Sequence, residues 1–266
     1  MDSSTLFDIK GRVAIVTAGA VGIGKMISQA LAEAGANVVV AQRRFDLCDA
    51  VCADYRTRFG VGALPVKLDV TKEPEIVACV EKAVAEFGRI DILVNNVGES
   101  IIKDTFATTL EEWNSVIALN LTSMFLLCRE AGRHMKSRGS GKVINIASVL
   151  GMRASWREYA TPGKTGELLS YASSKAAIIN FSRDLAANWA VHNITVNSIS
   201  PGWFVTPVTE SLVDDELRNL LIPRIPLKRP GVEDDMKGVA LFLASDASRY
   251  VTGHNLVVDG GWSCWM

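Results

Sequence analysis

Short apolar runs alternate with longer helical patterns along almost the whole chain. Seven runs rich in β-branched residues have the length of buried strands, at residues 13–17, 37–41, 63–68, 90–94, 142–146, 194–199 and 255–258. Six helical patterns lie among them, at residues 24–34, 45–59, 73–87, 110–137, 169–191 and 234–244. This order predicts right-handed crossovers and a parallel sheet with helices on both faces.

The chain has 266 residues, which is within reach of a single α/β domain with a large core. No low-complexity linker and no solenoid repeat interrupts the pattern. We therefore predict one Rossmann-like domain over residues 1–266, built on a doubly wound seven-stranded parallel sheet. Two stretches with several prolines or glycines break the rhythm, and we expect irregular substrate loops at residues 151–167 and 203–229.

Charge and composition argue against several classes of partner. The net charge is −1 with acidic and basic residues intermixed, so neither a nucleic acid nor an anionic membrane is expected. The first ten residues lack an apolar run, and we expect a cytoplasmic location. No metal site is expected either, because the three histidines are isolated and no cysteines form a CxxC pair. We expect all five cysteines, Cys48, Cys52, Cys79, Cys128 and Cys264, to be buried free thiols.

A glycine-rich segment follows the first strand and opens the first helix, at residues 17–24. Glycines there let backbone amides approach a pyrophosphate, and the N-terminus of the helix favours its negative charge. A tight turn from strand to helix would need glycine even without a ligand. The position of the segment, after the first strand of a βαβ pattern, favours dinucleotide binding.

The end of the second strand bears on the choice of dinucleotide. A carboxylate at this point would bind a ribose 2′-hydroxyl and repel a 2′-phosphate. The chain has Gln42 there instead, followed by Arg43 and Arg44. We therefore predict NADP as the preferred cofactor, with NAD possible. The alternative is that both arginines are ordinary surface charges.

Tyr171 and Lys175 are four residues apart in an alanine-rich helical segment, so they would share one face of the helix. A phenol is a poor proton donor or acceptor at neutral pH, but a nearby ammonium should lower its pKa. The pair is a candidate general acid/base. The same spacing also arises by chance on solvated helices.

Together these segments resemble the short-chain dehydrogenase/reductase family over nearly the whole chain. The motif T-G-x-x-x-G-x-G corresponds to residues 17–24, and N-N-A-G corresponds to residues 95–98. P-G-x-x-x-T corresponds to residues 201–206. The remaining matches are Asp69-Val70, Asn120, Ser148, Tyr171, Lys175 and the closing segments 243–246, 252–253 and 258–261.

The resemblance implies a role for each matching residue. Tyr171 would exchange the proton, Lys175 would lower its pKa and hold a ribose, Ser148 would hydrogen-bond the reacting oxygen, and Asn120 would fix a water linked to Lys175. An alkoxide formed during carbonyl reduction needs such donors. Ser148 could instead be a helix cap, and Asn120 a satisfied core amide. The implied cofactor contacts are Thr17, Gly19, Gly22, Ile23, Gly24, Arg43, Asp69, Val70, Asn96, Gly98, Tyr171, Lys175, Pro201, Gly202 and Thr206.

Three departures from the family pattern stand out. Ala18 replaces a loop glycine, which puts a left-handed backbone there in doubt, although Gly19 could take up the turn. Val97 replaces an alanine. Ser148 and Tyr171 lie 23 positions apart, wider than is usual for the family. Tyr159 is nearer to Ser148, but it lacks a lysine one turn later.

The widened loop carries Arg153, Trp156, Arg157, Glu158 and Lys164, which suit a hydroxylated or carboxylated substrate. The family branch with the greatest resemblance is that of gluconate 5-dehydrogenases and sugar or polyol reductases. We expect an NAD(P)-dependent oxidoreductase that interconverts a carbonyl and a secondary alcohol. The alternatives are a 3-oxoacyl-carrier-protein ketoreductase and a non-catalytic nucleotide-binding protein. Family resemblance also implies a homotetramer.

Overall fold

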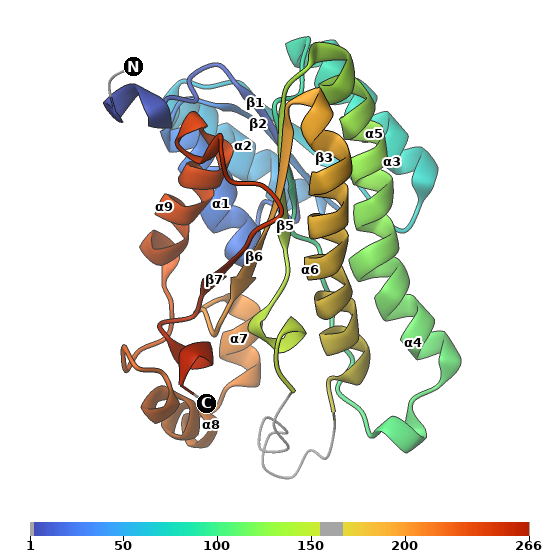
Figure 1. The fold of residues 1–266 in the computed structure, drawn as a ribbon, viewed down its shortest axis with the longest axis vertical. Coiled ribbons are helices and arrows are strands. Elements are labelled where there is room, and N and C mark those ends of the chain that lie inside the picture. The colour runs from blue at the N-terminus through green and yellow to red at the C-terminus, as the bar shows by residue number, and fades with distance from the viewer. Residues whose placement is uncertain (1–2, 155–166, 266) are drawn as a thin grey trace.

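The computed structural model describes residues 3–154 and 167–265 and contains a seven-stranded parallel sheet (Figure 1). The strand order is β3-β2-β1-β4-β5-β6-β7, which confirms the predicted doubly wound α/β fold. The direction of winding changes between β1 and β4, where such sheets leave a crevice for ligands. The strands are β1 (Val13–Thr17), β2 (Asn37–Gln42), β3 (Ala63–Lys67), β4 (Ile92–Asn95), β5 (Gly141–Ile146), β6 (Ile194–Pro201) and β7 (Asn255–Val258).

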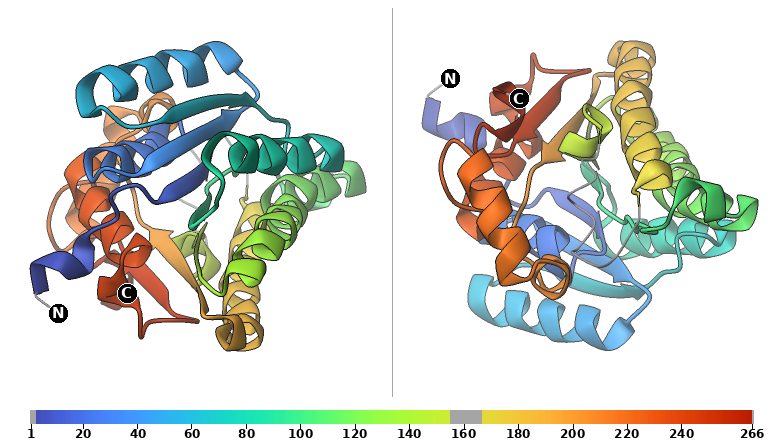
Figure 2. Two further views of the ribbon diagram at one scale, coloured as in Figure 1. Left: turned by 90° about the horizontal axis from the view of Figure 1, so that it is seen from above. Right: turned by 90° about the horizontal axis from the view of Figure 1, so that it is seen from below.

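Helices cover both faces of the sheet, as the two views in Figure 2 show. Alternate strand residues divide between two cores: Ala14 and Val16 of β1 face one, and Ile15 faces the other. The first core includes α1 (Gly22–Glu33), α2 (Phe45–Phe59) and α9 (Glu233–Ala244). The second includes α3 (Glu73–Phe87), α5 (Ser123–Arg138) and α6 (Leu169–Trp189). Short 3₁₀ turns are η1 (Ser3–Phe7), η2 (Thr105–Ala107), η4 (Val149–Gly151), η6 (Ala190–His192), η8 (Asp246–Ser248) and η9 (Trp262–Cys264).

The prediction of a single helix at residues 110–137 is wrong in one respect. The segment consists of α4 (Leu110–Ile117), a π-helical turn η3 (Ala118–Thr122) and then α5. Sequence periodicity cannot reveal this break, because one widened turn only shifts the apolar pattern slightly. Such turns in helices frequently lie at functional sites, and this one contains Asn120.

The second stretch expected to be irregular, residues 203–229, is partly helical. It contains α7 (Pro207–Leu212), α8 (Asp215–Leu221) and a 3₁₀ turn η7 (Ile222–Arg224). The prediction treated proline as a sign of a loop. Pro207 stands in the first turn of α7, where a backbone N–H has no partner within the helix and its absence costs no hydrogen bond. Apolar residues of this segment form a small third core with Val149 and Trp262. Of the first expected loop, residues 155–166, including Tyr159, lie outside the described part.

Four of the five cysteines are buried free thiols as expected, but the expectation is wrong for Cys264, which is exposed near the C-terminus. Across residues 3–154 and 167–265, no helix is long and apolar enough to cross a membrane. Within the same ranges, no group of three or more histidine, cysteine or carboxylate side chains could hold a metal ion.

Candidate active site

Tyr171 and Lys175 lie one turn apart near the start of α6, beside the carboxyl end of β5. The Nζ atom of Lys175 is 5.4 Å from the centroid of the Tyr171 ring. It also donates a 2.8 Å hydrogen bond to the carbonyl oxygen of Ile146, the last residue of β5. Lys175 is only 2% exposed. The helix therefore brings the pair together, and β5 fixes the ammonium in place.

Ser148 is buried just after β5 and has two contacts that serve different purposes. Its Oγ accepts a 3.1 Å hydrogen bond from the backbone N–H of Leu150 and so caps the short turn η4. The same hydroxyl hydrogen-bonds the phenol of Tyr171. The cap and the contact with Tyr171 are thus compatible roles for one side chain.

The pKa values at the site depart from the simple argument made from the sequence. We expected the ammonium of Lys175 to lower the pKa of Tyr171, but burial of the phenol raises that pKa, and only the hydrogen bond from Ser148 opposes the rise. Burial also lowers the pKa of Lys175 to about 8. The expectation is wrong because both groups share an apolar environment that penalises their charged forms.

Asn120 lies in the π-helical turn and is fully buried. Its Nδ2 donates to the carbonyl oxygen of Glu99 at 3.0 Å and to Oγ of Ser174 at 2.9 Å. Its Oδ1 accepts from the N–H of Glu99 at 2.9 Å. The side chain therefore ties the segment after β4 to α6, as a satisfied core amide would. A Cβ built on Gly98 would lie 3.1 Å from Nζ of Lys175 and 3.8 Å from Oδ1 of Asn120, so both groups flank one glycine.

The glycine-rich loop contains an unexpected left-handed residue. Ala18, rather than Gly19, has a positive φ of 50°. This conformation costs an L-residue roughly 1–2 kcal/mol, so the surrounding contacts must hold it. Helix α1 begins at Gly22, two residues earlier than expected. A Cβ built on Gly24 would lie 2.2 Å from the carbonyl oxygen of Ala18, which leaves no room for a larger residue.

Thr17 and Asn96 join the ends of β1 and β4, where the winding of the sheet reverses. The Oγ1 atom of Thr17 donates to the carbonyl oxygen of Val94 at 3.3 Å and accepts from the N–H of Asn96 at 3.0 Å. In return, Nδ2 of Asn96 donates to the carbonyl oxygen of Thr17 at 3.2 Å. These bonds hold the start of the glycine-rich loop against the neighbouring strand.

A cavity of about 190 Å³ lies between these elements at the carboxyl ends of the strands. It is lined by three of the four predicted catalytic residues, Ser148, Tyr171 and Lys175, and not by Asn120. Phe204, Thr209 and Ile146 also line it, although no motif singled them out. The lining is Ile23, Asn96, Gly98, Ile146, Ala147, Ser148, Tyr171, Lys175, Pro201, Gly202, Phe204, Thr206 and Thr209.

A second cavity of about 370 Å³ lies on the other side of Gly98. It is lined by Arg43 and Arg44, which are exposed, and by Gln42, which is buried. Asp69 and Val70 line it too, and they lie just after β3. The hydrogen bonds from Thr71 to Asp69, and more weakly the charge of Arg43, lower the pKa of the Asp69 carboxyl.

The remaining predicted cofactor contacts lie where the two cavities meet α1, β6 and α7. Thr206 caps α7 by accepting from the N–H of Thr209 at 3.1 Å. A Cβ built on Gly22 would lie 3.6 Å from Thr206, so this turn of α1 and the cap of α7 are close neighbours. Gly202 packs against Asp259, where a Cβ would lie 2.6 Å away. The two cavities share Gly98 and together line the expected dinucleotide site, with Tyr171 in one cavity and Arg43 in the other.

Comparison with known proteins agrees with this arrangement. A family model described as enoyl-(acyl carrier protein) reductase matches residues 18–263. The 2-dehydro-3-deoxy-D-gluconate 5-dehydrogenase of Escherichia coli (strain K12) is 37% identical over 259 residues, which cover 96% of this chain and 97% of that protein. The chain is a short-chain dehydrogenase/reductase.

Two other relatives of this short-chain dehydrogenase act on different classes of substrate. The 3-oxoacyl-[acyl-carrier-protein] reductase of Chlamydia trachomatis is 39% identical over 252 residues, 94% of this chain and 96% of its own. The solved structure of a gluconate 5-dehydrogenase from Burkholderia cenocepacia, in complex with NADP and tartrate, has a TM-score of 0.91 and 33% identity, and all of both chains is covered. This short-chain dehydrogenase is therefore an NAD(P)-dependent oxidoreductase that acts on a CH–OH group.

Proposed function

We propose that the protein interconverts a secondary alcohol and a ketone of a sugar acid, with NADP preferred over NAD. The observation that carries the proposal is the convergence of Ser148, Tyr171 and Lys175 on one small cavity. The names of the relatives support the substrate class, because both a 2-dehydro-3-deoxy-D-gluconate dehydrogenase and a gluconate 5-dehydrogenase cover nearly the whole chain. Arg43 and Arg44 support the preference for NADP.

In this proposal the side chains handle the proton and the negative charge of the reacting oxygen. A bound nicotinamide dinucleotide supplies or accepts the hydride. Ser148 donates a hydrogen bond to the substrate oxygen, and Tyr171 transfers the proton. Because burial raises the pKa of Tyr171, the phenol is held protonated and ready to act as an acid in ketone reduction.

Lys175 and Asn120 have supporting roles in the same proposal. Lys175 hydrogen-bonds the cofactor ribose and supplies positive charge when the phenolate forms. Its pKa of about 8 lets it gain or lose a proton near neutral pH. The side chain of Asn120 makes three hydrogen bonds, to Glu99 and Ser174, so we assign it to the position of the backbone beside Lys175.

A substrate screen with both cofactors tests the proposal directly. We expect oxidation of 2-dehydro-3-deoxy-D-gluconate at its C5 hydroxyl with NADP⁺ or reduction of 5-dehydrogluconate with NADPH, and slower turnover with NAD⁺ or NADH. Acetoacetyl-CoA serves as the comparison substrate, since the similarity to a carrier-protein reductase makes that activity the second candidate. Faster turnover of acetoacetyl-CoA than of every sugar acid would make the carrier-protein ketoreductase the first candidate. If no substrate is turned over although NADPH binds, the protein is a non-catalytic nucleotide-binding member of the family.

We further propose a homotetramer that pairs through α5 and α6. A groove of about 330 Å³ between these helices is lined by Phe125, Phe181, Leu185 and Trp189, and Phe125 is 46% exposed. An apolar groove of this kind suits a second copy of the chain. Light scattering after size exclusion should give four copies for the wild type and fewer for Phe125→Glu. An unchanged mass for the variant would point to another interface.

A cytoplasmic location completes the proposal. The four buried cysteines are unpaired thiols, which is usual for proteins of a reducing compartment. Fractionation of cells that produce the protein should recover it with cytoplasmic marker enzymes.

A further inference from the structure

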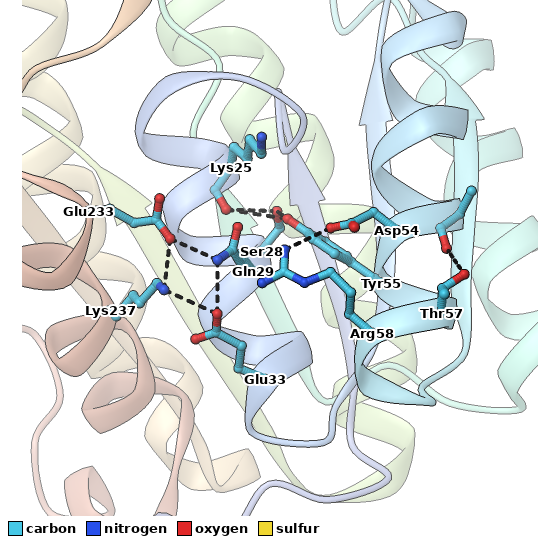
Figure 3. Close-up of polar contacts among 11 residues, drawn as sticks. Lys25, Ser28, Gln29, Glu33, Asp54, Tyr55, Thr57, Arg58, Glu233 and Lys237 are labelled. Carbon is cyan, nitrogen blue, oxygen red and sulfur yellow. Dashed lines mark hydrogen bonds and ion pairs between the residues drawn. The ribbon is translucent and has the colours of Figure 1, made fainter.

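Two buried side chains outside the active site contact the glycine-rich loop from the interior of the protein. Ser28 of α1 and Tyr55 of α2 are both fully buried. The Oγ atom of Ser28 donates a 2.6 Å hydrogen bond to the carbonyl oxygen of Gly19, and it lies 2.8 Å from the hydroxyl of Tyr55. Figure 3 shows Tyr55 pointing from α2 toward Ser28, with the carbonyl of Lys25 alongside. A chain of hydrogen bonds thus links α2, α1 and the loop.

The donor and acceptor of each hydrogen bond follow from the protons available and from the distances. A carbonyl oxygen can only accept, and Ser28 lies nearer to the carbonyl of Gly19, at 2.6 Å, than to that of Lys25, at 3.2 Å, so we direct its single proton to Gly19. Tyr55 then donates to Ser28 at 2.8 Å, in preference to the carbonyl of Lys25 at 3.4 Å. Burial raises the pKa of Tyr55, which keeps the hydroxyl protonated and able to donate. Tyr55 therefore orients Ser28, and Ser28 orients the carbonyl of Gly19.

The peptide group between Gly19 and Ala20 is held from its other side as well. The N–H of Ala20 donates to Oε1 of Gln42 at 3.4 Å. A trans peptide points its C=O and N–H in opposite directions, so contacts on both sides fix the orientation of the whole plane. Gly19 joins this peptide group to Ala18, whose left-handed backbone is unfavourable for an L-residue.

We propose that Tyr55 and Ser28 are positioning residues for dinucleotide binding, which hold the glycine-rich loop in its strained, binding-competent shape. Neither residue lines either of the two cofactor cavities, so their effect on binding passes through Gly19 and Ala18. Without the relay, the loop relaxes toward conformations in which Ala18 leaves the left-handed region. Cofactor affinity falls because part of the binding energy must then restore the loop.

The test is the dissociation constant of NADPH, measured from the change in protein and nicotinamide fluorescence at a temperature where every variant is folded. Ser28→Ala should bind NADPH about 10-fold more weakly, because it removes the bond to Gly19. Tyr55→Phe, which removes a single hydroxyl, should bind about threefold more weakly. At saturating NADPH and substrate, kcat should stay within about twofold of the wild type.

Two further variants separate positioning from simple core stability. Ser248→Ala removes another fully buried hydroxyl that donates to backbone carbonyls, in the 3₁₀ turn η8 that follows α9. It should lower the unfolding temperature and leave NADPH binding unchanged. Ala18→Gly introduces a residue that accepts the left-handed conformation, so in the Ser28→Ala background it should recover much of the lost affinity.

Several outcomes would overturn the proposal. If Ser28→Ala and Tyr55→Phe lower the unfolding temperature but bind NADPH like the wild type, the pair only stabilises the core. If the effects of Ala18→Gly and Ser28→Ala on binding simply add, the relay does not act through Ala18. The proposal assumes the dinucleotide site described above, and a wild-type protein that binds neither NADPH nor NADH would contradict that site rather than the relay.

Discussion

The two ends of the cofactor site are built in different ways. At the proposed proton-transfer end, the candidate catalytic side chains lie just after β5 and on α6, and Lys175 and Asn120 are held by hydrogen bonds to backbone atoms. At the nucleotide end, the important parts are backbone turns and glycines that permit close approach, with exposed cations at the rim. Substitutions at the first end should therefore change kcat, and substitutions at the second should change cofactor affinity.

Tyr171→Phe should have the largest effect. We expect kcat to fall by about 10²–10⁴-fold, because general acid/base catalysis has this magnitude, while the NADPH dissociation constant changes little. Steady-state kinetics together with fluorescence binding would show the split. Tyr250→Phe is the matched control, because Tyr250 is fully exposed. A kcat within tenfold of the wild type would remove Tyr171 from the proton-transfer role.

Gly24→Ala should weaken cofactor binding rather than lower kcat. Its Cβ would lie 2.2 Å from the carbonyl oxygen of Ala18 and 2.4 Å from Nδ2 of Asn96. Relief of such overlap costs about 1–3 kcal/mol, and we expect NADPH binding to weaken by about 10- to 100-fold if the loop bears that cost. In Gly238→Ala, on α9, the added methyl meets nothing within 4 Å. Equal effects of the two variants on binding would count against a close fit at Gly24.

Arg43→Ala should change cofactor preference by a smaller factor. A charge-assisted hydrogen bond to a 2′-phosphate is worth about 1.5–3 kcal/mol, so we expect the KM for NADPH to rise about 10-fold or more, with the KM for NADH unchanged. Arg58→Ala on α2 is the control, since Arg58 pairs with Asp54 away from the cavity. Equal changes in both KM values would indicate a general effect of charge.

The smallest predicted effect concerns the pH dependence of stability at Lys175. Its pKa in the folded protein is about 8, below the ordinary 10.5. Between these values the unfolded chain binds a proton that the folded protein does not, so this group makes stability rise with pH. Lys175→Met should therefore unfold at a higher temperature than the wild type near pH 7, and the difference should shrink toward pH 10.

Thermal unfolding of both proteins across this pH range would measure the effect. The buried cysteines titrate in both proteins and cancel in the comparison. A difference in unfolding temperature that does not vary with pH would mean that Lys175 is not held in a low-polarity environment.

The sequence predicts local features of the fold well and fails where a distant contact decides the local structure. All seven strands and the first three helices are found within a few residues of the expected positions, since periodicity and turn residues act locally. The π-helical turn at Asn120 was missed, because its side-chain partners Glu99 and Ser174 come from other segments. The helices at residues 207–221 were missed because Pro207 indicates a loop unless the first turn of a helix is considered.

The sequence alone determines which candidate reacting groups and which loop the protein has: Tyr171 and Lys175 at helical spacing, the glycines of residues 17–24, and Gln42 in place of an acid at the end of β2, followed by two arginines. Only the tertiary structure decides the state of those groups. Burial by several elements sets the direction of the pKa of Tyr171, and the left-handed Ala18 is bonded to Ala41 of β2, while Ser28 of α1 bonds the next residue, Gly19. Spacing along a chain fixes neighbours on one helix or strand, whereas burial and strain are sums over parts of the molecule that only folding brings together.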